Sequence, residues 1–419
     1  MYDYYSCQHR DVLCVDLKSF YASVSCILNG LNPLDTKLAV VGDTQRQGSV
    51  VLAATPPLKK IGIKTGSRLY EIPKRSDVYI TNPRMRTYMN ISTKISRIAL
   101  NYVPNEDFHQ YSIDEFFMDI TDSYRLFADS PYALAEMLQK EIYNDTGIKS
   151  TVGIGSNPLL AKISMDIEAK HNKNGIAEWR YQDVPTKLWS INKLTDFWGI
   201  NTKTAKKLNK KGIFTIKDLA NYPYLYLKRD FGIIGVDLHL HANGIDESLI
   251  RERHITKQKG LGKSQILMRD YKFNEIKAVI NEQVEEVYYR TRQKNRYPTT
   301  ITINVGYARG SGVRKQFTEK NGYRSTNHII NTFWDYLKCQ ADKGELYRTV
   351  GISFTNLRDK NIQQLELFKG EKELKAEILD SSLDKIRKKY GKDIVMRGTS
   401  LLDSGTLKSR KDLLGGHKS

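Results

Sequence analysis

Paired cysteines are missing from this 419-residue sequence. None of the four cysteines forms a CxxC pair; they are Cys7, Cys14, Cys26 and Cys339. HExxH motifs and paired-histidine zinc spacings are absent as well, and His239 and His241 have no cysteine near them in the sequence. We therefore expect the reduced thiols of a cytosolic protein and no zinc site.

Long apolar runs are missing too. No stretch approaches the roughly 20 apolar residues that span a bilayer. The first ten residues, MYDYYSCQHR, lack the apolar core of a signal peptide. No basic amphipathic anchor is present either, so we expect no membrane association.

Acidic residues are in the minority, with 47 Asp and Glu against 66 Lys and Arg and a formal net charge of +19. Such an excess is typical of proteins that bind a polyanion, with nucleic acid the first candidate and an anionic membrane surface the second. A merely soluble basic protein is the alternative. The hydrophobic content of 40% is enough for packed cores, and the length fits about three domains.

Strand and helix patterns alternate, which predicts an α/β (α+β) multidomain fold. In the first half, strands are predicted at 11–16, 37–41, 49–54, 108–120 (two strands around an acidic turn) and 150–155, and helices at 18–28, 84–100, 131–144 and 158–170. Thr55 followed by Pro56 and Pro57 predicts a short helix that Gly62 ends. A helical, lysine-rich region follows at 183–250.

From about residue 258 a second α/β unit is predicted. Its helices are expected at 273–294 and 325–338 and its strands at 299–307 and 347–354. Arg292, Lys294 and Arg296, at the end of the first of these helices, are expected to complement its dipole. The charged stretch 371–419 is expected to be a partly mobile tail.

Three acidic residues stand at the ends of predicted strands. Asp16 ends one strand, while Asp114 and Glu115 occupy the turn between two others. Because strand ends and turns can meet at one edge of a sheet, these carboxylates can converge on Mg²⁺, which prefers oxygen ligands. Two such ions about 3.5–4 Å apart serve nucleotidyl transfer. An ordinary exposed turn pair is the alternative reading of Asp114 and Glu115.

The motifs around these acids resemble a known family. DLKSFYASVS (16–25), YSIDEFFMDI (111–120) and VGIGSNPLLAKISMDIEAK (152–170) resemble the palm motifs of Y-family DNA polymerases. The similarity continues through WGINTKTAKKLNKKGIFTIKDLA (198–220), GLGKSQILMRD (260–270) and the final LLGGHKS. SIDEFF and the Gly-Gly-His ending are closest to the UmuC-like branch, the ImpB/MucB/SamB type.

This resemblance implies a low-fidelity, template-directed DNA polymerase for translesion synthesis and DNA repair, with a role in the SOS response. The implied right-hand architecture has a palm at 1–19 and 86–175, fingers at 20–85, a helix-hairpin-helix thumb at 176–250, a little finger at 255–360, and a clamp-binding peptide with a charged tail at 361–419. Two other classes remain open: a palm-type nucleotide cyclase, and a non-catalytic DNA- and clamp-binding protein with a degenerate palm.

Site residues carry over from the resemblance by position. Asp16, Asp114 and Glu115 match the metal-binding and catalytic carboxylates, with the backbone carbonyl of Leu17 as a further ligand of two Mg²⁺ ions. The residues that match the nucleotide site are Phe20, Tyr21 as the steric gate against a ribose 2′-hydroxyl, Lys59 and Lys170. Pro56 and Pro57 stand where a related branch has a triphosphate-binding tyrosine, and Asn157-Pro158 replaces a common Asn-Lys, so no phosphate contact is expected there.

Further positions match binding sites for macromolecules. The positions that match DNA contacts are Gly199, Asn201, Lys203 and Lys206 in the thumb loop, and Lys263 and Ser264 in the little finger. The residues that resemble a sliding-clamp (β subunit) binding peptide are Gln364, Leu365, Leu367 and Phe368. The implied partners are primer-template DNA, dNTP, the clamp and a UmuD-like accessory protein. We expect a cytoplasmic, nucleoid-associated monomer.

Overall fold

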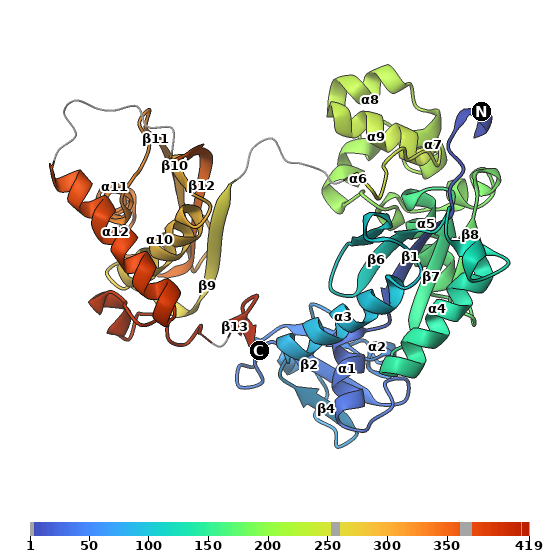
Figure 1. Cartoon of the computed structure of the whole chain (residues 1–419), viewed down its shortest axis with the longest axis horizontal. Coiled ribbons are helices and arrows are strands. Elements are labelled where there is room, and N and C mark those ends of the chain that lie inside the picture. The colour runs from blue at the N-terminus through green and yellow to red at the C-terminus, as the bar shows by residue number, and fades with distance from the viewer. Residues whose placement is uncertain (1–3, 253–259, 361–370, 412, 419) are drawn as a thin grey trace. The chain divides into compact units, whose positions relative to one another are not determined.

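The computed structural model describes residues 4–252, 260–360, 371–411 and 413–418. Its contacts divide the chain into two compact units (Figure 1). The first comprises Met1–Arg253 with Leu414–Ser419, and the second comprises His254–Leu413. In the described part of the chain no helix is long and apolar enough to cross a membrane.

A five-stranded sheet lies at the centre of the first unit. Its strands run in the order β5-β6-β1-β7-β8, with bounds β1 Val12–Leu17, β5 Phe108–Gln110, β6 Glu115–Asp119, β7 Ser150–Gly155 and β8 Ile176–Trp179. The central strand β1 is antiparallel to both β6 and β7. Strand β8 was not predicted from the sequence.

Helices cover both faces of this sheet (Figure 1). The helices α3 (Met85–Ala99) and α4 (Pro131–Thr146) lie on one face, where Leu13 and Val15 of β1 join their core. The helix α5 (Pro158–Ser164) and the π-helix that follows it, Met165–Ala169, cover the other face. Because side chains alternate along a strand, Val12, Cys14 and Asp16 share the face that α5 covers.

A smaller sheet of order β3-β2-β4 follows in the same unit. Its elements are α1 Phe20–Leu28, β2 Lys37–Val41, β3 Val51–Ala54, α2 Pro56–Lys60 and β4 Val78–Thr81. The prediction that α2 begins after Thr55 and ends before Gly62 is confirmed, and Gly62 has the expected positive φ of 95°. The Thr55 hydroxyl does not cap the helix; it accepts a hydrogen bond from the Leu38 amide (2.9 Å) and so ties α2 to β2.

A helical region completes the first unit, as its lysine-rich pattern predicts. Its helices are α6 Thr202–Asn209, α7 Ile216–Asn221, α8 Tyr224–Phe231 and α9 Ile233–Ala242. They share a separate core that includes Leu208, Ile213 and Leu227, all fully buried.

The second unit is a four-stranded sheet of order β11-β10-β12-β9 with helices on one face. Its elements are β9 Leu261–Tyr271, α10 Ile276–Arg292, β10 Arg296–Tyr307, β11 Gly312–Thr318, α11 Thr326–Gln340 and β12 Tyr347–Asp359. Ile303 and Ile352, neighbours on adjacent strands, are buried under the helices. Strands β9 and β11 were not predicted.

The charged C-terminal stretch is more ordered than the sequence suggested. It contains the helix α12 (Glu371–Tyr390) and a short hairpin of β13 (Leu413–Leu414) and β14 (His417–Lys418). The predicted dipole role of Arg292 needs correction, because its guanidinium pairs with Asp384 (2.6 Å) and Asp380 (3.4 Å) of α12. All three side chains are nearly buried, so Arg292 fastens α12 to α10.

Candidate active site

The register of the central sheet brings the predicted carboxylates together. Asp16 on β1 lies directly opposite Glu115 on β6, and residues opposite each other on antiparallel strands point to the same face. Asp114 precedes Glu115 at the turn, where its carbonyl accepts a hydrogen bond from the Leu17 amide (2.8 Å). The Ser112 hydroxyl donates to the Asp114 carboxylate (2.6 Å). All three acids therefore lie at one end of the β1–β6 pair.

Two lysines from the covering helices neutralise these acids. Lys162 of α5 pairs with Glu115 (2.6 Å) and with Asp166 (3.1 Å). Lys170 pairs with Asp166 (2.7 Å) and with Asp16 (3.3 Å). Asp166 thus links the two lysines, and opposite charges alternate from Glu115 to Asp16.

Lys162 and Asp166 were not identified from the sequence as site residues. Their spacing of four residues, repeated by Lys170, does place them on one face of the predicted helix 158–170. What the sequence could not show is that this face covers Asp16 and Glu115. The spacing alone is equally typical of a solvated helix surface.

Burial and charge shift the pKa values of these groups. Burial, with the neighbouring Asp114 and Glu115, raises the pKa of Asp16 to about 6 against the opposing effect of Lys170. Burial works against the charge of Lys162, but Cys14, Glu115 and Asp166 outweigh it and raise its pKa. Burial likewise opposes the charge of Lys170, and Asp16 and Asp166 raise its pKa. The carboxylates of Asp16, Glu115 and Asp166 therefore stabilise the protonated form of both lysines.

The donor set fits a hard divalent cation. Asp16, Asp114 and Glu115 supply carboxylate oxygens, the ligands that such ions prefer, and their mutual repulsion contributes to the raised pKa of Asp16. As they stand, His, Cys, Asp and Glu side chains within the described ranges form no group of three or more that could hold a metal ion. Lysine ammonium groups occupy one oxygen each of Asp16 and Glu115.

The predicted aromatic pair follows closely on β1, the strand that carries Asp16. Phe20 and Tyr21 open α1, after Ser19, which has the left-handed backbone conformation (φ 50°, ψ 46°). Such a conformation is costly for a residue other than glycine and is often found at functional sites. Phe20 is buried, whereas Tyr21 is only partly buried. Burial, Asp114 and Tyr88 together raise the pKa of Tyr21.

Lys59 of α2, beside the smaller sheet, reaches Ser19 at the start of α1. Its ammonium donates to the Ser19 hydroxyl (2.9 Å). Partial burial lowers the pKa of Lys59, as do Lys170 and Lys18, while Asp16 opposes them. The charges of Asp16 and Lys170 thus both act on the pKa of Lys59, and its role in a nucleotide site stays a prediction.

Asn157 has a structural role. Its side chain accepts a hydrogen bond from the Leu160 amide (2.9 Å) at the start of α5 and donates to the Gly244 carbonyl (2.8 Å). It is completely buried. Pro158, which stands where the lysine is common, is the first residue of α5, and Asn157 caps the helix.

The predicted thumb contacts lie together at the start of α6. Asn201 caps this helix by accepting from the Thr204 amide (2.9 Å), and Gly199 has a positive φ of 89°. Gly199, Asn201, Lys203 and Lys206 are all exposed. A turn with exposed backbone amides beside lysines suits a phosphate.

The two predicted contacts in the second unit point in opposite directions. Lys263 pairs with Glu286 of α10, so its side chain lies on the helix-covered side of β9. Ser264, the next residue, is exposed on the open side. Alternation along the strand explains the difference, and only Ser264 is presented on the open face of the sheet.

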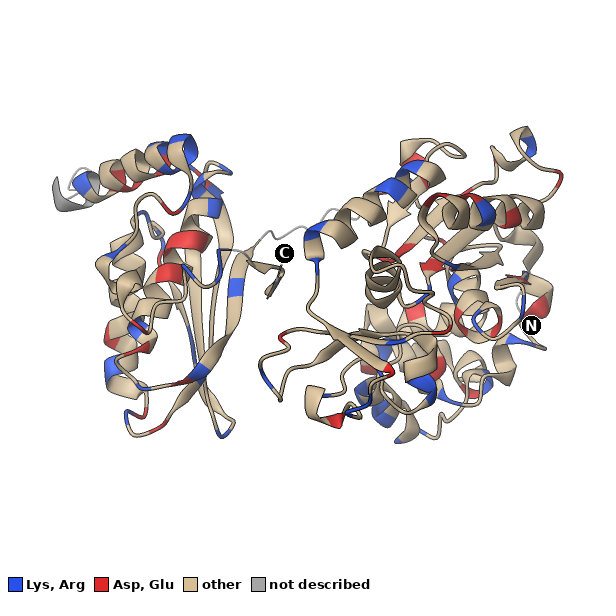
Figure 2. Cartoon of the chain, turned by 90° about the horizontal axis from the view of Figure 1, so that it is seen from below, with Lys and Arg blue, Asp and Glu red and all other residues tan. Residues whose placement is uncertain are grey.

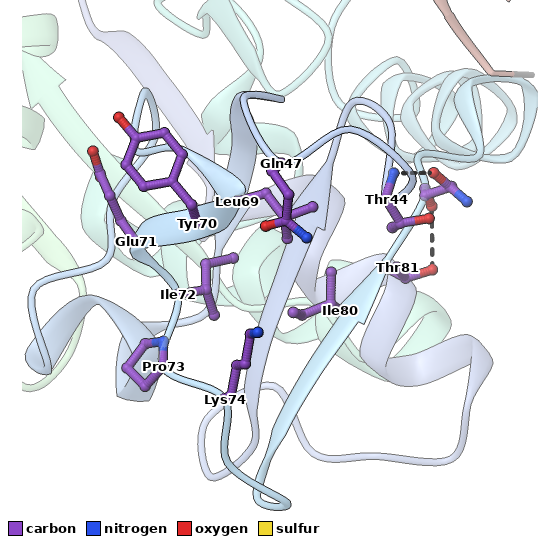
Figure 3. Close-up of a pocket in the computed structure, with 11 residues that line it drawn as sticks. Thr44, Gln47, Leu69, Tyr70, Glu71, Ile72, Pro73, Lys74, Ile80 and Thr81 are labelled. Atoms are coloured by element: carbon purple, nitrogen blue, oxygen red, sulfur yellow. Dashed lines mark hydrogen bonds between the residues drawn. The ribbon is translucent and has the colours of Figure 1, made fainter.

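The predicted clamp-binding residues Gln364, Leu365, Leu367 and Phe368 lie outside the described residues. A pocket of about 820 Å³ lies elsewhere, against the smaller sheet of the first unit (Figure 3). Leu69, Ile72 and Ile80 contribute its apolar lining, and Gln47 and Lys74 its polar lining. None of the predicted site residues lines this pocket.

Comparisons with known proteins agree with the geometry. Residues 15–166 match the impB/mucB/samB family, residues 258–367 match the C-terminal domain of that family, and residues 181–213 match its HHH motif. The putative UV-damage repair protein UvrX of Bacillus subtilis (strain 168) is 43% identical over 100% of both chains. DNA polymerase IV 2 of the same organism is 33% identical, over 98% of this chain and 99% of the relative.

Solved structures show the same fold. A Y-family DNA polymerase chimera of Dbh and Dpo4 matches with a TM-score of 0.67 and 23% identity, covering 83% of this chain and 99% of the other. An insertion ternary complex of Dbh DNA polymerase matches with a TM-score of 0.52 at the same identity and the same coverage of both chains. The palm, helix-hairpin-helix thumb and little finger predicted from the sequence are therefore present.

The chain belongs to the impB/mucB/samB family of Y-family DNA polymerases, which perform translesion synthesis. Its activity is that of a DNA-directed DNA polymerase in DNA repair. The UmuC-like branch is consistent with this family. Membership of this family also implies dependence on a divalent metal. The two alternative functions, a nucleotide cyclase and a non-catalytic DNA-binding protein, are not favoured.

Proposed function

We propose that Asp16, Asp114 and Glu115, with the backbone carbonyl of Leu17, hold two Mg²⁺ ions for nucleotidyl transfer onto a primer 3′ end. When bound, the ions supply activation of the 3′-hydroxyl and stabilisation of the leaving pyrophosphate. The observation that carries this proposal is the register of β1 and β6. It places Asp16 opposite Glu115, and the pKa of Asp16 rises to about 6.

The chain's own residues then bind and orient the incoming nucleotide. Lys59 and Lys170 approach the carboxylates from two different helices and are suited to the triphosphate, where lysine acts as a point charge. Phe20 and Tyr21 form the surface beneath the sugar, with Tyr21 as the steric gate. A tyrosine ring at that point excludes a ribose 2′-hydroxyl by collision.

Duplex DNA is proposed to contact both units through polar surfaces. In the first, Gly199, Asn201, Lys203 and Lys206 form an exposed phosphate-binding turn. In the second, the open face of the sheet carries exposed or partly exposed polar side chains, among them Ser264, Asn304, Arg314, Gln316 and Ser353. Figure 2 shows Lys and Arg spread along the whole described chain rather than gathered in one block. Such contacts position DNA without reading its sequence.

Primer extension tests the metal site. With Mg²⁺ and dNTPs, wild-type protein is expected to extend a primer on undamaged and abasic templates, and Asp114→Ala is expected to abolish extension. Asp122→Ala is the matched control, since Asp122 lies in the same unit with a largely exposed side chain. Equal extension by wild type and Asp114→Ala would rule out the proposed site. If wild-type protein is inactive, repeating the assay with clamp and accessory protein decides whether a partner is required.

The segment around Gln364-Leu365-Glu366-Leu367-Phe368 is proposed to bind a sliding clamp, because it follows the last strand of the little finger and resembles a clamp-binding pentapeptide. A peptide of residues 360–370 should compete with the full chain for the β subunit. A peptide with Leu367 and Phe368 changed to alanine should not. Lack of competition by the unchanged peptide would exclude this contact. The UmuD-like accessory protein, the cytoplasmic location and the monomeric state stay predictions.

A further inference from the structure

The ring of Tyr21 packs against a second tyrosine that the sequence reading did not single out. Tyr88 of α3 stacks on Tyr21, with ring centroids 4.5 Å apart and ring planes inclined by 13°. Phe20 completes the group, with its centroid 5.9 Å from Tyr21 and 6.4 Å from Tyr88. The helix that carries the proposed gate and the long helix of the palm thus share a cluster of three rings.

Tyr88 is itself held firmly. Its side chain is completely buried, and its hydroxyl makes a 2.7 Å hydrogen bond with the hydroxyl of Ser25. Ser25 lies one turn beyond Tyr21 on α1, on the same side of the helix. Tyr88 is therefore tied to α1 at two points, through a ring stack and through a hydrogen bond.

Tyr21 differs from Tyr88 in having room to move. It is only partly buried and lies at the edge of two apolar cores, one in the palm and one in the fingers. Burial, Asp114 and Tyr88 raise the pKa of Tyr21. A ring that excludes a 2′-hydroxyl by collision works only if it cannot rotate away, so its stacking partner matters for selectivity.

We propose that Tyr88 is a positioning residue for sugar discrimination, because its stack on Tyr21 fixes the gate ring against the incoming nucleotide. This inference rests on the proposed gate function of Tyr21. Tyr88 is completely buried and packs its ring against Phe20 and Tyr21, so it acts on the nucleotide through these rings and not by direct contact. Loss of the ring at position 88 frees Tyr21 to rotate and lets a ribonucleotide fit.

The test compares kcat/KM for one dNTP with kcat/KM for the matching rNTP in single-nucleotide insertion by the full chain. Tyr88→Leu is expected to lower this ratio about threefold to tenfold, the range that an aromatic stack provides. Tyr21→Ala should lower the ratio at least as much. The double variant should equal Tyr21→Ala alone, because no gate ring remains to be positioned.

Two variants serve as matched controls. Tyr88→Phe and Ser25→Ala each remove the hydroxyl contact and keep all three rings, so both should retain the wild-type ratio. Because the ratio compares two substrates in one preparation, the fraction of folded enzyme cancels. Tyr88→Met is a second variant that lacks the ring at position 88. The ratio can be measured for Tyr88→Leu and Tyr88→Met even if only part of the protein is folded.

The outcomes separate the two proposals. An unchanged ratio in Tyr21→Ala would show that Tyr21 is not the gate. A lowered ratio in Tyr21→Ala with a wild-type ratio in both Tyr88→Leu and Tyr88→Met would overturn the positioning role of Tyr88 alone. A further drop when Tyr88→Leu is added to Tyr21→Ala would overturn it too, since Tyr88 would then act by another route. A lowered dNTP-to-rNTP ratio in Tyr88→Phe, which keeps the ring, would show that the ring stack is not what maintains sugar discrimination.

Discussion

Single residues around Asp16 are fixed by contacts from three separate segments. Strand pairing sets Asp16 opposite Glu115, Lys170 approaches from the helix side, and Ser19 turns the chain in a left-handed conformation immediately after the strand. The Lys59 ammonium donates to the Ser19 hydroxyl, so it lies beside the C-terminal end of β1. The strained residue thus joins the proposed metal strand to the proposed nucleotide site.

Lys59→Ala is expected to lower kcat/KM for dNTP incorporation roughly 10-fold to 100-fold. A hydrogen bond to a charged group contributes about 1.5–3 kcal/mol, and each 1.4 kcal/mol or so is a factor of ten. Steady-state insertion kinetics measure the effect. Lys60→Ala is the control, because Lys60 is the next, exposed residue of the same short helix. Equal kinetics for the two variants would remove Lys59 from the nucleotide site.

At the scale of elements, α5 and its π-helical continuation determine where the lysines lie. The sequence predicted one regular helix over 158–170. The structure instead changes to a π-helix at Met165, and the Lys170 amide donates to the Met165 carbonyl five residues back (3.1 Å). The extra residue in this turn changes the direction of Lys170, which pairs with both Asp166 and Asp16. Such π turns often occur at functional sites.

Close packing of α5 on β7 depends on glycine. A Cβ at Gly153 would lie 2.0 Å from the Ala161 carbonyl oxygen, a contact that only a backbone shift can relieve. Gly153→Ala is therefore expected to lower the free energy of unfolding by about 3 kcal/mol and to abolish primer extension by moving Lys162. Gly48→Ala is the control, because a Cβ there meets no atom within 4 Å. Denaturant unfolding and primer extension measure both effects, and wild-type behaviour of Gly153→Ala would contradict the packing.

At the scale of the whole molecule, the net charge of +19 should make DNA binding depend strongly on salt. Each phosphate contact releases counterions and adds about 0.9 to the slope of log affinity against log salt concentration. Changing both Lys203 and Lys206 to alanine should reduce that slope by about 1.8. Fluorescence anisotropy of labelled primer-template over a salt series measures the slope. Lys140→Ala, an exposed lysine on α4, is the control, and an unchanged slope in the thumb variant would exclude those contacts.

Much of the fold follows from local patterns in the sequence. Runs such as DVLCVD and KLAVV predicted β1 and β2 because short apolar segments are typical of buried strands. Strands β9 and β11, which were not predicted, are largely exposed on one side and polar. Their strand structure comes from hydrogen bonding to β12 and β10 rather than from their own composition.

The sequence by itself determined the family, and it singled out the carboxylates and the aromatic pair as candidate site residues, because these residues lie in short motifs whose order is kept along the chain. The tertiary structure alone decided which neighbours they have. Lys162 reaches Glu115, Tyr88 stacks on Tyr21, and Lys263 turns away from the open face of its sheet. These contacts join segments 23 to 67 residues apart in the sequence. Only the packing of helices on sheets brings such side chains within reach of one another.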